Sequence, residues 1–229
     1  ESGGQVGDTG YLRTDSAKLE VRDTTKAQGH HLHHAVVVQG SIEVGASVSA
    51  TIDESLRARI KANHSATHLM HEALRRVLGE HVQQKGSLVD ADKLRFDFSH
   101  TQSLSADELS RVTQLVNEQI RHNSEVLTQE MEMDAAIEAG ATALFGEKYG
   151  DAVRVLTMGS DRFSVELCGG THVARTGDIG VFRILNESGV AAGVRRIEAV
   201  TGIGALSDIA KVDKVVADIC DVVKSSPEN

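Results

Sequence analysis

The spacing of hydrophobic residues changes near residue 51, and this change constrains the fold more than any other feature of the sequence. Before it, apolar residues occur in short runs, as in residues 35–38, or alternate with small residues, as in Val44, Ala46 and Val48. Both patterns are typical of short strands separated by turns. We therefore expect residues 1–50 to form a small, glycine-rich β-subdomain that resembles a β-barrel.

Helical spacing begins at residue 51. Thr51 and Glu54 have the spacing of a capping box, which predicts a helix start, and Gly79 is suited to end that helix. Ser105 and Glu108 repeat the capping-box spacing and predict a second helix. The other expected elements are a shorter helix over 134–144, strands over 153–155, 163–167, 179–185 and 194–200, and a last helix over 203–223.

This mixed order of helices and strands predicts an α+β fold. We expect three parts: the β-subdomain over 1–50, an α/β core over 51–202, and a C-terminal helix over 203–229. The 229 residues are sufficient for a substantial hydrophobic core. The sequence opens at Glu1, without Met and within a motif, so we expect a piece of a longer protein.

Composition excludes several classes of protein. Five Phe, two Tyr and no Trp leave too few rings for RNA binding by a row of stacked aromatics. The formal net charge of −9 argues against a phosphate-binding chain as a whole. Two cysteines make no disulfide framework and favour a reducing compartment, hence a cytoplasmic location. No apolar run approaches the roughly 18 residues of a membrane span.

Two pairs of residues together predict a metal site. His64 and His68 are four residues apart on the first expected helix, which puts both imidazoles on one face. Cys168 and His172 flank the dipeptide Gly169-Gly170, whose glycines allow a tight turn. Either pair could arise by chance, but together they form a Cys-His₃ set that is normal for zinc.

Other histidines compete for this assignment. His71 returns to the helix face of His64 and could replace a ligand or line a pocket. The histidine-rich run over residues 30–34 would place its imidazoles on both faces of a strand, so we interpret it as a solvated or half-packed strand. A zinc-protease site is disfavoured, because no glutamate lies between His64 and His68.

Six segments resemble the editing region of bacterial alanyl-tRNA synthetases. More loosely, the histidine pair and the Cys-Gly-Gly-Thr-His segment are similar to freestanding editing proteins and to threonyl-tRNA synthetase editing domains. The opening residues 1–8 are similar to the glycine-rich motif of the alanyl enzymes. The segments are His64–His68, Gln84–Ser87, Arg95–Phe98, Leu144–Tyr149, Glu166–His172 and Ala192–Glu198.

The resemblance implies hydrolysis of the ester in tRNA(Ala) mischarged with serine or glycine. It also implies that His64, His68, Cys168 and His172 bind Zn²⁺, which either activates a water or binds the substrate's amino group. Gln84 matches a pocket position near the aminoacyl end, and we add Ser87 because it lies in the same segment. Expected partners are tRNA(Ala) and the aminoacylation and C-terminal domains of a full-length enzyme, to which the last helix would lead.

Several alternatives stay open. The chain could be a freestanding trans-editing deacylase, an editor of seryl-tRNA(Thr), or a domain in which a closed four-ligand zinc site is only structural. The general base is unknown: Asp97 and Glu166 are candidates, although a surface or salt-bridge role is the simpler interpretation of each. The basic pairs are interpreted either as solvated faces or as contacts to the acceptor stem; they are Arg57/Arg59, Arg75/Arg76 and Arg195/Arg196.

Overall fold

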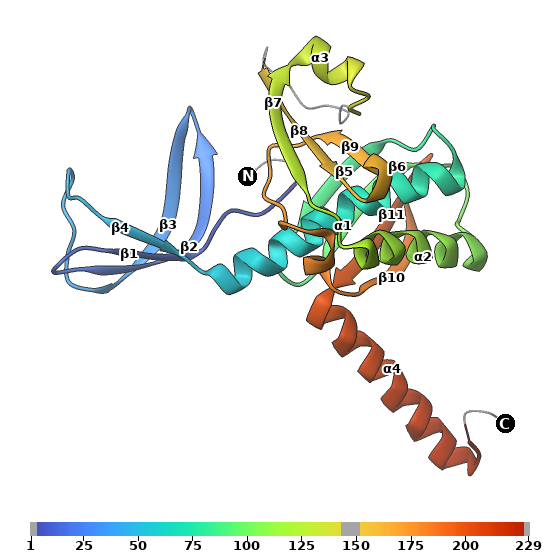
Figure 1. The fold of residues 1–229 in the computed structure, drawn as a ribbon. Helices are drawn as coiled ribbons and strands as arrows, with labels where there is room; N and C mark the ends of the chain where they lie inside the picture. Colours follow the sequence, from blue (N-terminus) through green and yellow to red (C-terminus); the bar gives the residue numbers. More distant parts are fainter. Residues whose placement is uncertain (1–3, 143–151, 227–229) are drawn as a thin grey trace.

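A computed structural model describes residues 4–142 and 152–226 (Figure 1). The described chain is α+β, as predicted, with three antiparallel sheets and four α-helices. The strands of the first sheet are β1 (Gly10–Arg13), β2 (Lys18–Ala27), β3 (His30–Gln39) and β4 (Ser49–Ile52). Those of the second are β5 (Gln84–Val89), β6 (Leu94–Ser99), β10 (Phe182–Ala191) and β11 (Val194–Thr201), and those of the third are β7 (Leu127–Glu132), β8 (Ala152–Met158) and β9 (Ser164–Leu167).

The first sheet is open, with strand order β3-β2-β1-β4. The expected barrel is therefore not closed among the described residues: β3 and β4 are the two edges. The strand predicted through Val44, Ala46 and Val48 was also wrong, because Val44 is fully exposed in a turn and the chain re-enters the sheet only at Ser49. Figure 1 shows this sheet to one side of the remaining molecule, joined to it through α1.

Helix α1 (Glu54–Leu78) starts later than predicted. Thr51 pairs with Tyr11 between β4 and β1, so it cannot cap a helix. Asp53 is the cap instead, and its carboxylate accepts from the Leu56 amide at 3.0 Å. The predicted end at Gly79 is confirmed, since this residue is the C-cap.

Helices α1 and α2 (Ala106–His122) pack together beside the second sheet, whose strand order is β10-β11-β6-β5. The predicted capping box of Ser105 and Glu108 at the start of α2 is confirmed. Strands β5 and β6, which the sequence analysis did not anticipate, line the main hydrophobic core. The largest fully buried side chains of this core include Phe96, Phe98, Leu69 and Met70. This rigid packing surrounds the central turns of α1, where the histidine pair lies.

The third sheet carries the chain into the loop that holds Cys168. Its order is β7-β8-β9, and β9 begins at Ser164 rather than at Phe163. Helix α3 (Met133–Glu138) is shorter than the predicted span 134–144, of which residues 143 and 144 lie outside the described range, as does the segment 144–149. The strand expected from residue 179 begins at Phe182, after the 3₁₀ turn η2 (Thr176–Ile179); a similar turn, η1, covers Ser160–Arg162.

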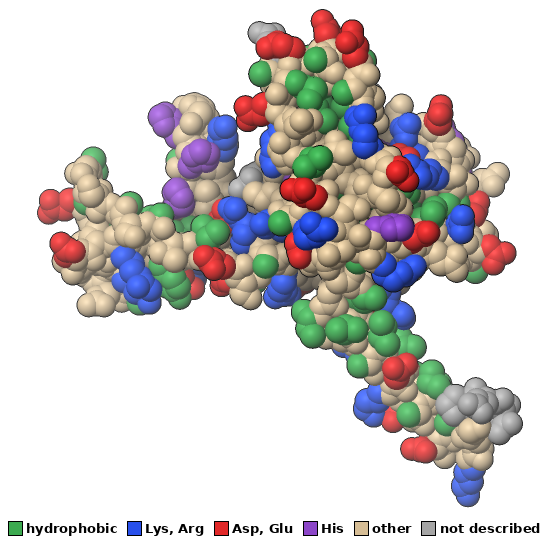
Figure 2. All heavy atoms as spheres, in the orientation of Figure 1, with side chains coloured by type: hydrophobic (Ala, Val, Ile, Leu, Met, Phe, Trp, Pro, Cys, Tyr) green, Lys and Arg blue, Asp and Glu red, His purple; other side chains and the backbone are tan. Residues whose placement is uncertain are grey.

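The last helix, α4 (Gly202–Val223), agrees with its predicted span and extends away from the sheets (Figure 1). Only Ala205 is buried on it. Hydrophobic side chains are exposed along α4, and they gather where it leaves the body of the molecule (Figure 2). None of the described helices is long and apolar enough to cross a membrane.

Candidate metal centre

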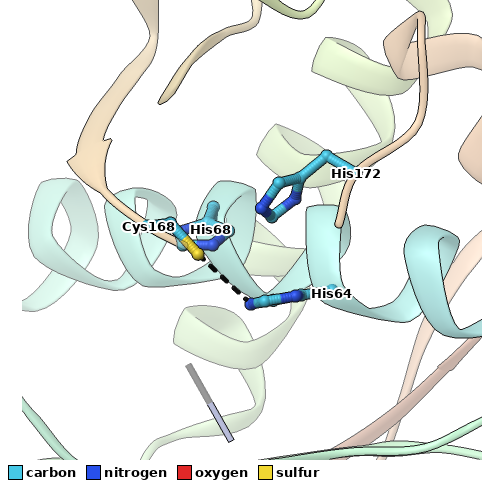
Figure 3. Close-up of side chains that lie close together, drawn as sticks. All are labelled: His64, His68, Cys168 and His172. Atoms are coloured by element: carbon cyan, nitrogen blue, oxygen red, sulfur yellow. Dashed lines mark hydrogen bonds between the residues drawn. The ribbon is translucent and has the colours of Figure 1, made fainter. Parts of the chain in front are cut away.

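Four buried side chains from two distant segments converge in the core. Helix α1 supplies His64 and His68, and the loop after β9 supplies Cys168 and His172 (Figure 3). Their ligand atoms all lie within 4.8 Å of one another, and the exposed fractions of the four residues are 1%, 2%, 2% and 8%. The structure thus brings together the two pairs that the sequence analysis combined. This group can hold a metal ion.

The helix places its two imidazoles as their spacing predicted. His64 and His68 stack with 5.1 Å between ring centroids, one turn apart on the buried face of α1. His172 approaches both rings from the loop, at 4.5 Å from His64 and 5.1 Å from His68. Cys168 Sγ lies 3.6 Å from His64 Nε2 (Figure 3). The four donors therefore surround one small volume.

Gly170 is needed for close approach rather than for an unusual backbone conformation. Neither Gly169 nor Gly170 has a positive φ. A Cβ on Gly170 would lie 2.2 Å from His64 Cε1 and 2.6 Å from His64 Nδ1, whereas Gly169 is exposed. Arg154 on β8 donates to the Gly170 carbonyl, and the Gly170 amide lies 3.4 Å from Cys168 Sγ. The turn at Gly170 therefore packs directly against the His64 ring of α1.

Each imidazole of the group is held through its Nδ1 atom by a separate side chain. Gln5 Oε1 lies 2.8 Å from His64 Nδ1, Glu166 Oε2 lies 2.5 Å from His68 Nδ1, and Ser65 Oγ lies 3.3 Å from His172 Nδ1. A second set of partners of this kind orients imidazole ligands and selects their tautomer in metal sites. The Nε2 atoms are thereby left for the centre of the group.

Two of these Nε2 atoms lack a partner. Those of His68 and His172 are buried and make no hydrogen bond within the described chain. An unpaired buried polar atom is costly, so its occurrence at two converging nitrogens calls for a ligand. Three imidazoles and one thiol are a normal donor set for Zn²⁺. The residues present therefore fit a metal ion, and zinc in particular.

Burial and neighbouring charges divide the histidines into two kinds. Burial opposes the charged form of His68, but the Glu166 carboxylate and Cys168 outweigh it and raise the pKa of His68 to about 10. Burial, followed by repulsion from His68, lowers the pKa of both His64 and His172 well below 6.5. In the metal-free protein, one proton is therefore held at His68 while the other two rings stay neutral.

Glu166 is buried beside the metal group and contacts two histidines of α1. The sequence analysis offered a surface or a salt-bridge role: the surface role is wrong, because Glu166 is only 3% exposed, and the salt-bridge role is confirmed by its contacts with His68 and His71. Its second oxygen, Oε1, lies 2.8 Å from Nδ1 of His71. Burial would raise the pKa of Glu166, but His71 and His68 together hold it well below its usual range. Because a carboxylate can only accept, both histidines present an Nδ1–H to it.

His71 is therefore not one of the four converging ligands. It is 2% exposed and packs its ring 5.1 Å from that of Phe96, while its Nε2 has no hydrogen-bond partner in the described chain. Sequence reasoning did not single out Gln5 or Ser65. A signal for Ser65 was its place between the two helical histidines, but nothing local to Gln5 indicated its contact.

Gln84 and Ser87 lie on β5, outside the metal group. Gln84 is the first residue of the strand, half-buried opposite Phe98. Ser87 is opposite Phe96, the residue whose ring contacts His71. The Ser87 hydroxyl is buried and has no hydrogen-bond partner in the described chain.

The remaining sequence candidates lie elsewhere. All residues of β3, including the histidine run over 30–34, are exposed, which confirms a solvated strand. Asp97 is bound by Arg196 at 2.6 Å and 2.7 Å, which confirms its salt-bridge interpretation. The other arginines of the basic pairs also have carboxylate partners: Arg57 with Asp8, Arg59 with Asp92, Arg75 and Arg76 with Glu72, and Arg195 with Glu187.

Two family models match parts of this chain. Residues 153–198 match the model of the threonyl and alanyl tRNA synthetase second additional domain, which includes Cys168 and His172. Residues 1–56 match the model of class II (A) tRNA synthetases. Two separate parts of the chain are thus similar to domains of aminoacyl-tRNA synthetases.

Alignments with individual proteins are more specific than the family models. The chain is 59% identical over 228 residues to the alanine–tRNA ligase of Chromohalobacter salexigens and 56% identical over 229 residues to that of Pseudomonas syringae pv. syringae. Each alignment covers 100% of this chain and 26% of the relative, so the chain spans about a quarter of the relatives' length. The chain is thus similar along its whole length to a part of alanine–tRNA ligases.

Proposed function

We propose that this chain is the editing region of an alanine–tRNA ligase, which hydrolyses the ester of tRNA(Ala) charged with serine or glycine. The observation that carries the proposal is the group of four buried ligand atoms within 4.8 Å of one another, in a chain that is similar to alanine–tRNA ligases.

The physical need for correction follows from size. A synthesis pocket that accepts alanine also admits glycine, and it rejects serine by only a tolerated hydroxyl, a difference of roughly 1–3 kcal/mol. A second site can spare alanine if it is built to hydrogen-bond the serine hydroxyl, because alanine would leave those groups unpaired. Hydrolysis at that second site removes the products that the first site cannot exclude.

His64, His68, Cys168 and His172 would hold Zn²⁺ in this proposal. Bound there, zinc would supply a Lewis acid beside the ester carbonyl. The protein's own contribution is to orient the three rings through Gln5, Glu166 and Ser65 and to exclude bulk water from the ligands. The general base stays unassigned; Glu166 is already engaged by two histidines.

Two features support an approach route for the substrate. A cavity of about 310 Å³ lies between the first sheet and the metal loop, and its lining includes Lys26, His31 and Gly169. Gly169 adjoins Cys168 and is exposed, so the loop is accessible from this side. We place Gln84 and Ser87 near the aminoacyl group, where the unpaired Ser87 hydroxyl would gain a polar partner.

The proposed partners follow from this similarity. They are tRNA(Ala), which the ion-paired arginines of this chain are poorly placed to bind alone, and the aminoacylation and C-terminal domains of the whole ligase. Cys168 and Cys220 are both free thiols, which supports a reducing compartment and hence the cytoplasm.

One observation favours a second candidate function, in which the metal only stabilises the fold. All four candidate ligands are buried, and a site closed by four protein ligands is usually structural. The two candidates differ in what they predict for hydrolysis, because a structural metal would leave this chain without deacylase activity.

The deciding experiment compares deacylation of Ser-tRNA(Ala), Gly-tRNA(Ala) and Ala-tRNA(Ala) at low salt, with zinc quantified in the same sample. We expect loss of serine and glycine, but not alanine, together with about one zinc per chain. Bound zinc without hydrolysis, both here and in the full-length ligase, would favour the structural candidate. Equal hydrolysis of Ser-tRNA(Thr) would instead indicate a different or a freestanding editing role.

Replacing one ligand tests the link between metal and activity. We expect Cys168→Ala to lose zinc and to reduce deacylation at least 100-fold, because an outer-partner change alone already costs about 10–100-fold. The matched control is Cys220→Ala on α4, which should retain both. Full activity of the Cys168 variant without metal would refute the proposed chemistry.

The proposed pocket residue has its own test. Gln84→His should change the ratio of serine to alanine hydrolysis several-fold while zinc content stays constant, because Gln84 lies outside the metal group. The neighbouring exposed residue gives a control in Gln83→His. An unchanged ratio in both variants would remove Gln84 from the pocket.

A further inference from the structure

The extreme N-terminal segment of the described chain contributes a buried side chain to the metal centre. Gly4 and Val6 hydrogen-bond to Val89 of β5, at 2.9 Å and 3.0 Å, so this segment lies alongside the strand. Gly4 permits the approach: its φ is +78° and a Cβ there would lie 2.3 Å from the Ser87 carbonyl oxygen. The next residue, Gln5, is only 6% exposed and reaches the metal group.

The contacts of Gln5 fix which way its amide points. Oε1 accepts from the Thr171 backbone amide at 2.9 Å, and Nε2 donates to the Thr171 hydroxyl at 2.8 Å. A backbone N–H can only donate, so Oε1 must be the acceptor. The same oxygen lies 2.8 Å from His64 Nδ1, which therefore carries the proton. His64 Nε2 is left with its lone pair toward Cys168 Sγ, 3.6 Å away.

One side chain thus joins both halves of the metal group. His64 belongs to α1, and Thr171 lies between Cys168 and His172 in the loop. Gly170, packed between them, would carry a Cβ 3.1 Å from Gln5 Oε1. Gln5 supplies no ligand of the group, yet it restrains a ligand from the helix and the loop that holds the other pair.

We propose that Gln5 is a positioning residue of the metal centre, which holds His64 in the Nδ1–H tautomer with Nε2 free to bind the metal. The inference rests on the proposed metal function of the four ligands. Gln5 lies within residues 1–56, which match the class II synthetase model, whereas Cys168 and His172 lie within 153–198. A residue of the segment that matches one family model therefore contacts the loop in the segment that matches the other.

The test uses binding of zinc and cobalt to the chain rather than its activity. We expect Gln5→Met, which keeps the length but removes the acceptor, to weaken Zn²⁺ affinity about 10–100-fold in competition with a chromophoric chelator. It should also shift the visible bands of the Co²⁺-loaded protein, because the geometry at His64 changes. Gln5→Glu keeps the acceptor and should stay close to wild type. Gln129→Met, at an exposed position on β7, is the matched control.

The outcomes separate three situations. If Gln5→Met binds zinc as tightly as wild type with an unchanged cobalt spectrum, Gln5 only anchors the segment and the inference is wrong. If Gln5→Glu loses the metal as Gln5→Met does, the acceptor role is wrong. Should Gln5→Met not fold, Gln5→Asn, which keeps the amide but shortens it, must show the same weakening. A wild-type chain that binds no zinc would refute the proposed metal function itself.

Discussion

At the scale of single residues, the metal centre depends on two glycines, because the absence of their side chains leaves space for neighbouring groups. Gly170 leaves the space into which the His64 ring fits, and Gly4 leaves the space in which the N-terminal segment meets β5. Neither requirement is visible in a local pattern, because the neighbour in each case is distant in sequence. The sequence indicated a tight Gly-Gly turn; the structure shows that the second glycine is sterically constrained by the His64 ring.

This constraint predicts a sharp difference between adjacent substitutions. Gly170→Ala should displace His64 and Gln5 and weaken zinc binding at least tenfold, because its Cβ would overlap His64 Cε1 at 2.2 Å. Gly169→Ala, at an exposed position, should bind zinc as the wild type does. Zinc titration of the two proteins checks this, and equal affinities would contradict the packing described.

At the scale of elements, β9 is tied to α1 by one buried carboxylate. Glu166 bonds to His68 and His71, three residues apart on the same helix. The sequence analysis left a surface role and a salt-bridge role open for Glu166. The structure shows the salt bridge, with α1 covering the carboxylate, because periodicity alone cannot distinguish solvent from a polar partner.

The ionised pair predicts a pH dependence for the metal-free protein. The pKa of His68 is raised from 6.5 to about 10, so its contribution to stability is full below pH 6.5 and is lost as the pH rises through about 10. Because the pKa of Glu166 is lowered, its contribution to stability is full above pH 4.5 and is lost as the pH falls below that value. Glu166→Gln should therefore lower the free energy of unfolding most between pH 4.5 and 6.5, by roughly 3–5 kcal/mol.

Denaturant unfolding of both proteins in chelator, from pH 4.5 to 10, measures this difference. His71 and Cys168 also face the pair, so His71→Asn serves as a comparison for effects on the second oxygen of Glu166. A destabilisation that grows from pH 6.5 to 10 would contradict the assigned charges.

Helix ends show why some elements were predictable and others were not. Ser105 and Glu108 cap α2 as predicted, because the box is entirely local. Thr51 and Glu54 have the same spacing, but Thr51 belongs to β4 and pairs with Tyr11, forty residues earlier in the chain. Strands β5 and β6 were not predicted, although Leu94, Phe96 and Phe98 alternate along β6; β6 pairs with β11, about a hundred residues later, and β5 pairs with β6. Local sequence signals therefore predicted an element correctly, except where pairing with a distant strand opposed them.

At the scale of the whole molecule, the site joins parts that the sequence analysis treated as separate. The first segment reaches the core through Gln5, the long helix supplies one ligand pair, and the loop after β9 supplies the other. The convergence of these four side chains was predictable because two local motifs, each weak alone, together form a normal metal-binding set. Their supporting residues were not, because Gln5 and Thr171 are 166 positions apart.

The separation of the ligand pairs also sets an order in time. His64 and Cys168 are 104 residues apart, so a ribosome making roughly 5–20 residues per second completes the second pair about 5–20 s after the first. During that interval the two helical histidines have emerged without the thiol and the third imidazole. A nascent chain that stops before Cys168 holds half of the metal group, however abundant the metal, and the complete group exists only after the loop has been synthesised.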